Sequence, residues 1–118
     1  RTYVRANKLS KKLKANAISW EQLNNSSGYL LINATSVGMK NPDEMIVKEK
    51  VIKNFSVVMD AVIYPPETKL LKISKETGKE IISGTLMCVY QAAEQFKIYT
   101  GFDIPEEILN ITLKGLEK

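Results

Sequence analysis

The chain of 118 residues is 44% hydrophobic and 25% charged, which excludes a disordered or fibrous protein and predicts one globular domain with a real core. It contains no histidine and a single cysteine, Cys88, so a histidine-based triad, a histidine or thiolate zinc site and an internal disulfide are all excluded. Its apolar runs have the length of strands, so we expect no membrane span, and a first residue other than methionine leads us to expect a processed product or a fragment.

The N-terminal part is strongly basic. The formal net charge of the chain is +4, and the first 14 residues carry six bases and no acid. Apolar residues close to helical spacing predict a basic amphipathic helix over Tyr3 to Leu13. Such a face is usually solvated, but it also suits a phosphate or a nucleic-acid backbone, and composition does not choose between these. A short mixed run then predicts a strand over Asn16 to Trp20, followed by a loop at 24–28.

Continuous apolar runs predict two buried parallel strands in the middle of the chain. The first, Tyr29 to Ile32, leads into a loop of small and polar residues at 33–39. The second, Ser56 to Ile63, is stopped by Pro65 and Pro66, which cannot continue the ladder of a sheet.

Helical patterns dominate the C-terminal half. We expect a helix over Thr68 to Ser74 closed by Gly78, a strand at Glu80 to Ile82, a helix from Thr85 to Tyr99 ended by Gly101, and a last helix that opens at Asp103 or Pro105. Strands that alternate with helices predict an α/β fold, a doubly wound parallel sheet with helices on both faces. Ligands of such sheets bind at the carboxyl ends of the strands, where the loops after residues 32, 63 and 83 should converge.

Two stretches have the pattern of a ligand site. Small residues at 33–39 would let a flat ligand approach the backbone, although an ordinary turn is the simpler interpretation. On the helix after Gly84, Met87 and Gln91 are four residues apart and share a face. A buried Gln91 could hydrogen-bond a hydroxylated substrate, whereas an exposed one would have no such role. Cys88, in the same apolar stretch, is expected to be a buried thiol, which favours a reducing compartment.

Four motifs stand in order along nearly the whole chain. They are Arg1-Thr2-Tyr3-Val4-Arg5-Ala6, Ile32-Asn33-Ala34-Thr35-Ser36-Val37-Gly38-Met39, Asp60-Ala61-Val62 with Pro65, Thr68, Leu70 and Leu71, and Ser83-Gly84 with Met87, Gln91, Ala92 and Ala93. In these motifs the chain resembles the shikimate dehydrogenase family, and most closely the dehydrogenase half of the plant bifunctional dehydroquinate dehydratase/shikimate dehydrogenases.

The resemblance implies NADP as the cofactor. Its implied binding residues are Arg1, Thr2 and Arg5 at the adenosine 2′-phosphate, Thr35 and Ser36 along the crevice, and Ala61, Gly84 and Met87 near the nicotinamide. Paired guanidinium donors suit a phosphate, which favours NADP over NAD. Gln91 would reach the hydroxyls of the substrate. Where the family has a substrate-contacting tyrosine this chain has Ile63, with Tyr64 one place later, so the contact is shifted or lost.

The resemblance also implies that parts of the family's protein lie outside this span. Residues 1–118 would be the C-terminal portion of the NADP-binding domain, a partial Rossmann-like sheet without its first strands and Gly-rich loop, and the last helix would pack toward the substrate domain. The six glycines form no Gly-x-Gly-x-x-Gly pattern. The catalytic lysine and aspartate would lie upstream, so the span should not catalyse alone. One strand would lack its neighbours in the sheet, and an apolar strand edge would be exposed. We therefore expect a fragment that is marginally stable or partly molten.

The expected function is part of an NADP-dependent shikimate dehydrogenase, which interconverts 3-dehydroshikimate and shikimate in aromatic amino acid biosynthesis. The implied partners are that substrate, an upstream substrate domain and a dehydratase domain in the same polypeptide. The implied location is the chloroplast for a plant protein and the cytoplasm otherwise. Two alternatives stay open, a quinate dehydrogenase and a non-catalytic remnant that binds cofactor or, through the basic helix, nucleic acid. No metal is expected.

Overall fold

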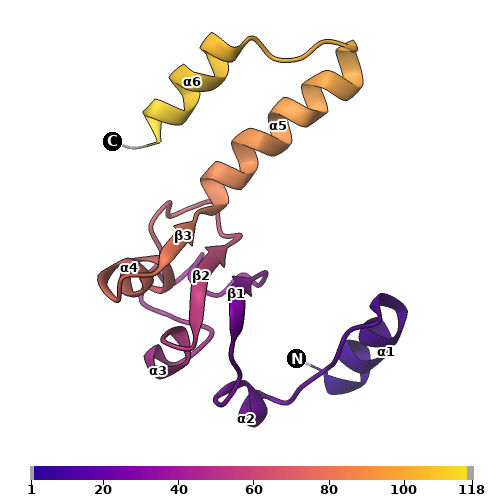
Figure 1. Ribbon diagram of the computed structural model, residues 1–118, viewed down its shortest axis with the longest axis vertical. Helices are drawn as coiled ribbons and strands as arrows, with labels where there is room; N and C mark the ends of the chain where they lie inside the picture. Colours follow the sequence, from indigo (N-terminus) through magenta and orange to yellow (C-terminus); the bar gives the residue numbers. More distant parts are fainter. Residues whose placement is uncertain (1, 117–118) are drawn as a thin grey trace.

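The computed structural model describes residues 2–116. A parallel three-stranded sheet lies at its centre, and helices extend away from the sheet at both ends of the chain (Figure 1). The strands are β1 Gly28–Asn33, β2 Phe55–Asp60 and β3 Glu80–Ile82, in the order β1-β2-β3. The predicted α/β class and its three parallel strands are confirmed.

Six helices accompany the strands within the described residues. They are α1 Tyr3–Leu13, α2 Trp20–Leu23, α3 Glu49–Ile52, α4 Lys69–Glu76, α5 Gly84–Thr100 and α6 Glu106–Gly115. The helices predicted around α1, α4, α5 and α6 are confirmed to within a few residues at each end. Thr68 caps α4 and accepts a hydrogen bond from the Leu71 amide at 3.4 Å, and Gly78 follows that helix with a φ of 73°.

The register of the sheet places its core on one face. Leu31 of β1 lies opposite Val58 of β2, and this face packs against residues of α3 and α4. The buried cluster consists of Leu31, Val47, Val51, Ile52, Phe55, Val58 and Leu70. Burying each such side chain contributes about 1.5–3 kcal/mol, so this cluster is the main stabilising element of the fold. We call residues 28–83 the sheet module.

The opposite face of β1 is open. Leu30 and Ile32 alternate with Leu31 and are 39% and 51% exposed, and Figure 1 shows α1 standing apart from β1. The expectation of two buried strands, covered by helices on both faces, is therefore wrong for β1. The expected exposed apolar edge is confirmed, because β1 is the terminal strand of the sheet and Tyr29 is 73% exposed.

One predicted strand and one predicted strand boundary are also wrong. No strand forms over Asn16 to Trp20, because a strand needs a neighbour for its backbone groups and none of the described strands pairs with this segment. Residues 15–19 are an extended connection to α2 instead. Ser19 caps that helix through reciprocal bonds with Gln22, at 2.8 and 3.3 Å. β2 ends at Asp60 rather than Ile63, because the Asp60 side chain takes over the hydrogen bond of the Val62 amide.

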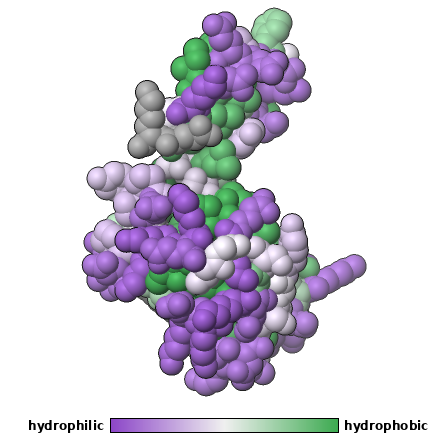
Figure 2. Space-filling view, turned by 60° about the vertical axis from the view of Figure 1, so that its left-hand side comes forward, coloured by the Kyte–Doolittle hydropathy of each residue, from purple (hydrophilic) through white to green (hydrophobic). Residues whose placement is uncertain are grey.

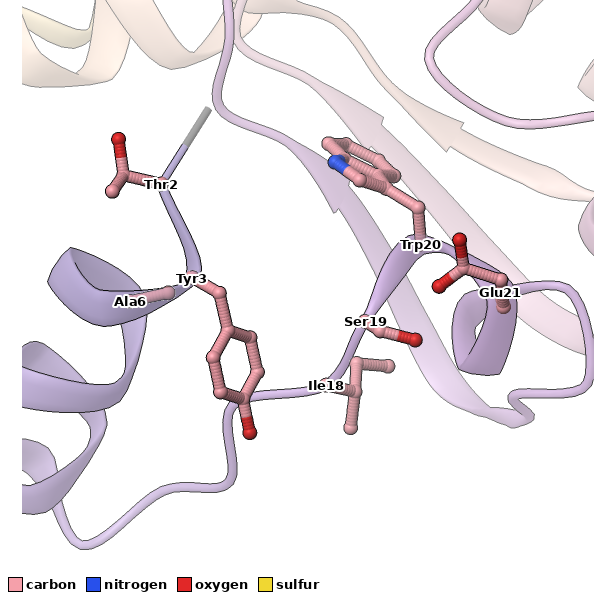
Figure 3. Close-up of a pocket in the computed structure, with 7 residues that line it drawn as sticks. All are labelled: Thr2, Tyr3, Ala6, Ile18, Ser19, Trp20 and Glu21. Atoms are coloured by element: carbon pink, nitrogen blue, oxygen red, sulfur yellow. The ribbon is translucent and has the colours of Figure 1, made fainter.

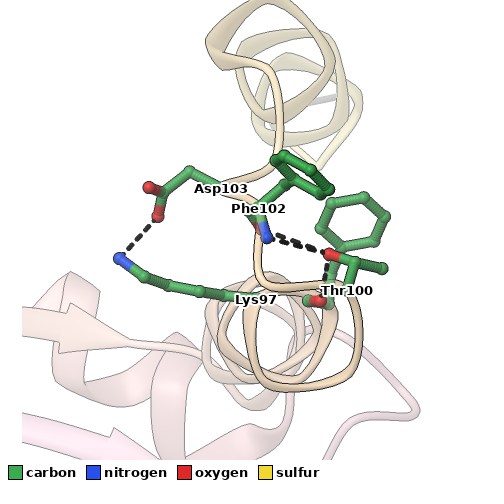
Figure 4. A network of polar contacts seen from close by, with 5 residues as sticks. Lys97, Thr100, Phe102 and Asp103 are labelled. Carbon is green, nitrogen blue, oxygen red and sulfur yellow. Dashed lines mark hydrogen bonds and ion pairs between the residues drawn. The ribbon is translucent and has the colours of Figure 1, made fainter.

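The two C-terminal helices form an arm, here called the helical arm (α5 and α6). Gly101 ends α5 with a left-handed φ of 76°, and Thr100 accepts a hydrogen bond from the Phe102 amide in the turn (Figure 4). Lys97 pairs with Asp103 across this turn at 2.7 Å. The hydrogen bond to the Asp103 carboxylate, together with its charge, raises the pKa of Lys97.

Apolar side chains of the helical arm remain at the surface. Ile98, Tyr99 and Phe102 are 75%, 81% and 73% exposed. Figure 2 shows apolar surface that continues from the sheet module into the arm. Among residues 2–116 no helix is both long and apolar enough to span a bilayer.

Candidate functional site

A buried polar network holds together the loops that follow β1 and β2. Asp60 is fully buried and accepts hydrogen bonds from the Asn33 amide group at 3.0 Å, the Val62 backbone amide at 3.0 Å and the Thr68 hydroxyl at 2.7 Å. Asn33 also donates to the Val37 carbonyl at 3.1 Å. Because a buried carboxylate is costly unless its oxygens are hydrogen-bonded, this network fixes both loops to the end of the sheet.

The loop after β1 presents Thr35 and Ser36 at the carboxyl end of the strand, as predicted. The Thr35 hydroxyl points inward, donating to the Asn33 side-chain oxygen at 2.7 Å and accepting from the Val37 amide at 3.2 Å. The structural role of the Thr35 hydroxyl is therefore to hold the loop in its conformation through these two hydrogen bonds. Both residues line a hollow of about 700 Å³, together with Trp20, Val37, Met45 and Ile46. Gly38 completes the turn with a φ of 94°, a conformation that favours glycine.

The loop after β2 meets the start of α5 at Gly84. A Cβ atom at Gly84 would lie 2.3 Å from the Val62 carbonyl oxygen and 2.8 Å from the Ala61 carbonyl carbon. Only glycine therefore allows the helix to begin this close to the loop. Ser83 caps α5 by accepting from the Leu86 amide at 3.2 Å. The structure thus brings Ala61 and Gly84 together at the strand ends.

The predicted residues of α5 face a less enclosed environment. Met87 is half-buried on the first turn, whereas Gln91 one turn later is exposed. Ile63 and Tyr64, the two candidates for the substrate-contacting position, are 46% and 78% exposed in the loop after β2. The expectation that Cys88 is buried is wrong, because α5 leaves the sheet and presents this thiol to solvent.

The residues predicted at the 2′-phosphate lie around the start of α1. Arg1 falls outside the described residues. Thr2 is the N-cap of α1 and lines a hollow of about 330 Å³ with Trp20, and Arg5 lines a separate shallow hollow with Lys8, Leu9 and Lys12. Thr2 and Arg5 are thus one helical turn apart but face different hollows. Arg5 is exposed, so its side chain is free to change rotamer.

The bonds that join Asp60 to Asn33 and Thr68, and the position of Trp20, were not predicted from the sequence. Asp60 and Thr68 are eight residues apart, and their hydroxyl–carboxylate pair depends on the turn between them. The Ser19–Gln22 spacing is a recognisable capping box, and it could have indicated that Trp20 begins a helix. Among residues 2–116 no group of three or more acidic or cysteine side chains is placed to hold a metal ion.

Known proteins with similar sequences are shikimate dehydrogenases. The chain is 39% identical over 112 residues to the bifunctional 3-dehydroquinate dehydratase/shikimate dehydrogenase, chloroplastic, of Arabidopsis thaliana, an alignment that covers 92% of this chain and 19% of that protein. It is 34% identical over 116 residues to the NADP(+) shikimate dehydrogenase of Aquifex aeolicus, covering 98% of this chain and 42% of that protein. The chain thus spans less than half the length of either relative. No protein-family model matches it.

Solved structures show the same fold. The shikimate 5-dehydrogenase of Thermus thermophilus, determined in complex with NADP(H) and shikimate, superimposes with a TM-score of 0.81 at 25% sequence identity. The superposition covers 98% of this chain and 44% of that one. The arrangement of sheet, loops and helices described above is therefore that of a Rossmann-like dehydrogenase fold.

Proposed function

Because this chain belongs to the shikimate dehydrogenase family, we propose that it forms one side of an NADP site in a longer shikimate dehydrogenase polypeptide. The reaction proposed for that polypeptide is the NADP-dependent interconversion of 3-dehydroshikimate and shikimate. The observation that carries the proposal is the convergence of the loops after β1, β2 and β3 at the carboxyl end of a parallel sheet.

The residues at this sheet end fit a dinucleotide. The side chains of Asn33 and Thr35 form hydrogen bonds within the loop after β1, so they leave the outer surface of the loop open to a ligand. At Gly84 the missing side chain keeps the junction of the β2 loop and α5 flat. Basic residues on α1, with Arg5 among them, supply positive charge on the side of the N-terminus. NADP, when bound, supplies the hydride chemistry of the family.

The roles proposed for individual side chains follow from their positions. Thr2 and Arg5, with Arg1, would hold the 2′-phosphate, and Ser36 would contact the ligand from the loop after β1. Ala61, Gly84 and Met87 would border the nicotinamide, because Ala61 and Gly84 meet where β2 ends and α5 begins, and Met87 lies in the first turn of α5. Gln91 is exposed one turn beyond Met87 and would donate to a hydroxyl of the substrate. Proton transfer at the substrate carbonyl would fall to residues outside this span.

We extend the proposal to the domain, its partners and its location. Residues 1–118 would be the C-terminal portion of the NADP-binding domain, and the exposed apolar residues of the helical arm would pack toward the substrate domain. The name of the Arabidopsis relative supports a fused dehydratase and a chloroplast location for a plant protein. Import of the full-length gene product into isolated plastids, followed by immunodetection, tests the location.

The test of function is reduction of NADP with shikimate and, in parallel, with quinate by the complete polypeptide. We expect faster reduction with shikimate, and no turnover by the 118-residue chain alone.

Gln91→Ala should raise the KM for shikimate roughly 10-fold, because one hydrogen bond to the substrate is lost. Gln95→Ala, at another exposed glutamine one turn further along α5, is the matched control and should leave KM unchanged. A complete polypeptide that is inactive with both substrates would contradict the proposal, and one faster with quinate would favour quinate dehydrogenase.

A further inference from the structure

Trp20 presents an exposed ring at the capped start of a helix. It is the single tryptophan of the chain, and 59% of it is exposed although indole is a large and mostly apolar group. It opens α2 directly after Ser19, whose capping box with Gln22 fixes the backbone there. Figure 3 shows the indole ring pointing toward the Thr2 side of the hollow rather than along α2.

The same ring forms a wall between two hollows. It lines the hollow of about 330 Å³ that contains Thr2, and it also lines the hollow of about 700 Å³ that contains Thr35 and Ser36. Both volumes lie in the range of small-molecule sites, about 300–1,000 Å³. A dinucleotide that extends from Thr2 to the loop after β1 must therefore pass the face or edge of Trp20.

The smaller hollow suits a flat heteroaromatic base better than a phosphate. Tyr3, Ile18 and Trp20 provide aromatic and apolar walls and are 57%, 45% and 59% exposed. The charged side chain of the hollow is Glu21, and a hydrogen bond with Ser19 lowers the pKa of its carboxyl group. An ionised carboxylate repels a phosphate, but it accepts a hydrogen bond from the exocyclic amino group of adenine.

We infer that Trp20 is the platform on which the adenine ring of the cofactor stacks, in the hollow between α1 and α2. The inference rests on the proposed function and adds to it a binding residue at the adenosine end. Stacking of a base on an aromatic side chain is worth about 1–3 kcal/mol, which corresponds to a change of about 5- to 150-fold in Kd.

The test uses the 118-residue chain and adenosine 2′,5′-bisphosphate, whose adenine ring and 2′-phosphate are expected to contact residues of this span. Titration calorimetry gives its Kd for the wild type, Trp20→Leu and Trp20→Phe. Because Trp20 is the single tryptophan, its fluorescence reports stacking directly. We expect the bisphosphate to quench this emission, and ribose 5-phosphate, which carries a phosphate but no base, to leave it unchanged. Trp20→Leu should weaken binding about 5- to 150-fold, and Trp20→Phe should weaken it less than Trp20→Leu.

One control variant and two possible outcomes complete the test. Tyr29→Leu removes another exposed aromatic ring, outside both hollows, and should not change Kd. If the bisphosphate binds without quenching and Trp20→Leu keeps the wild-type affinity, the role of Trp20 is refuted while the proposed function stands. If the folded wild-type chain does not bind the bisphosphate at millimolar concentration, the adenosine site of the proposed function is refuted, and the role of Trp20 with it.

Discussion

The sheet module and the helices outside it differ in how they hold their apolar side chains. In the sheet module, Ile52, Val58 and Leu70 are 1% exposed or less. In α1 and the helical arm, Val4 and Tyr99 are 73% and 81% exposed. The chain therefore supplies its own core beneath the proposed cofactor loops, whereas the flanking helices gain little stability from contacts within the chain.

The largest effect should come from breaking the buried network of the sheet module. Asp60→Ala leaves three donors without their acceptor, those of Asn33, Val62 and Thr68, and should lower the free energy of unfolding by about 3–5 kcal/mol. Asp103→Ala removes an exposed carboxylate from the helical arm and should leave the free energy of unfolding almost unchanged, because solvent screens an exposed ion pair. Urea unfolding followed by circular dichroism measures both, and equal effects would contradict the distinction between the two regions.

The next largest effect is expected where α5 joins the sheet module. Gly84→Ala forces a Cβ atom to within 2.3 Å of the Val62 carbonyl oxygen, so the helix must shift, at a cost of about 3 kcal/mol. Gly115→Ala is the matched control in α6, because open space surrounds its added methyl group and alanine favours helix. Thermal unfolding should show a lower Tm for the first variant and no decrease for the second. A Gly84→Ala protein with the wild-type Tm would show that the close approach is absent in solution.

The smallest effect concerns pH and the turn of the helical arm. The pKa of Lys97 is raised by Asp103, so the pair favours the folded state at pH values below the ordinary lysine pKa of about 10.4. This contribution is lost as pH rises through the higher pKa of the folded state. NMR titration of the Lys97 side chain should show a lower pKa in Asp103→Asn than in the wild type. An unchanged value would mean that the ion pair does not persist in solution.

The sequence predicted the sheet module better than its surroundings. The strands β1, β2 and β3 lie on the apolar runs that predicted them. They pair in parallel, as the alternation of strands and helices along the chain predicts. The strand expected over Asn16 to Trp20 failed because pairing depends on a neighbour, which local composition does not encode. The four-residue helix α3 has too few turns for a periodic signal.

The candidate site was predictable to a similar degree. Motif positions correctly placed Thr35, Ser36 and Gly84 at the strand ends. They did not reveal that the Thr35 hydroxyl bonds inward, or that Gly84 is required by packing against Val62. Both facts depend on contacts between segments that are distant in sequence or on the local fold of the loop. Exposure of Cys88 was missed for the same reason, because the direction of α5 is not encoded in its apolar pattern.

We propose that one side of an NADP site lies at the strand ends of the sheet module. An NMR titration of the isotope-labelled 118-residue chain with NADP tests this proposal. We predict that the backbone amide signals of Thr35, Ser36, Ala61 and Gly84 shift together with that of Thr2, along one saturable binding curve. Shifts confined to the lysines of α1, or no shifts at all in the folded chain, would contradict the claim.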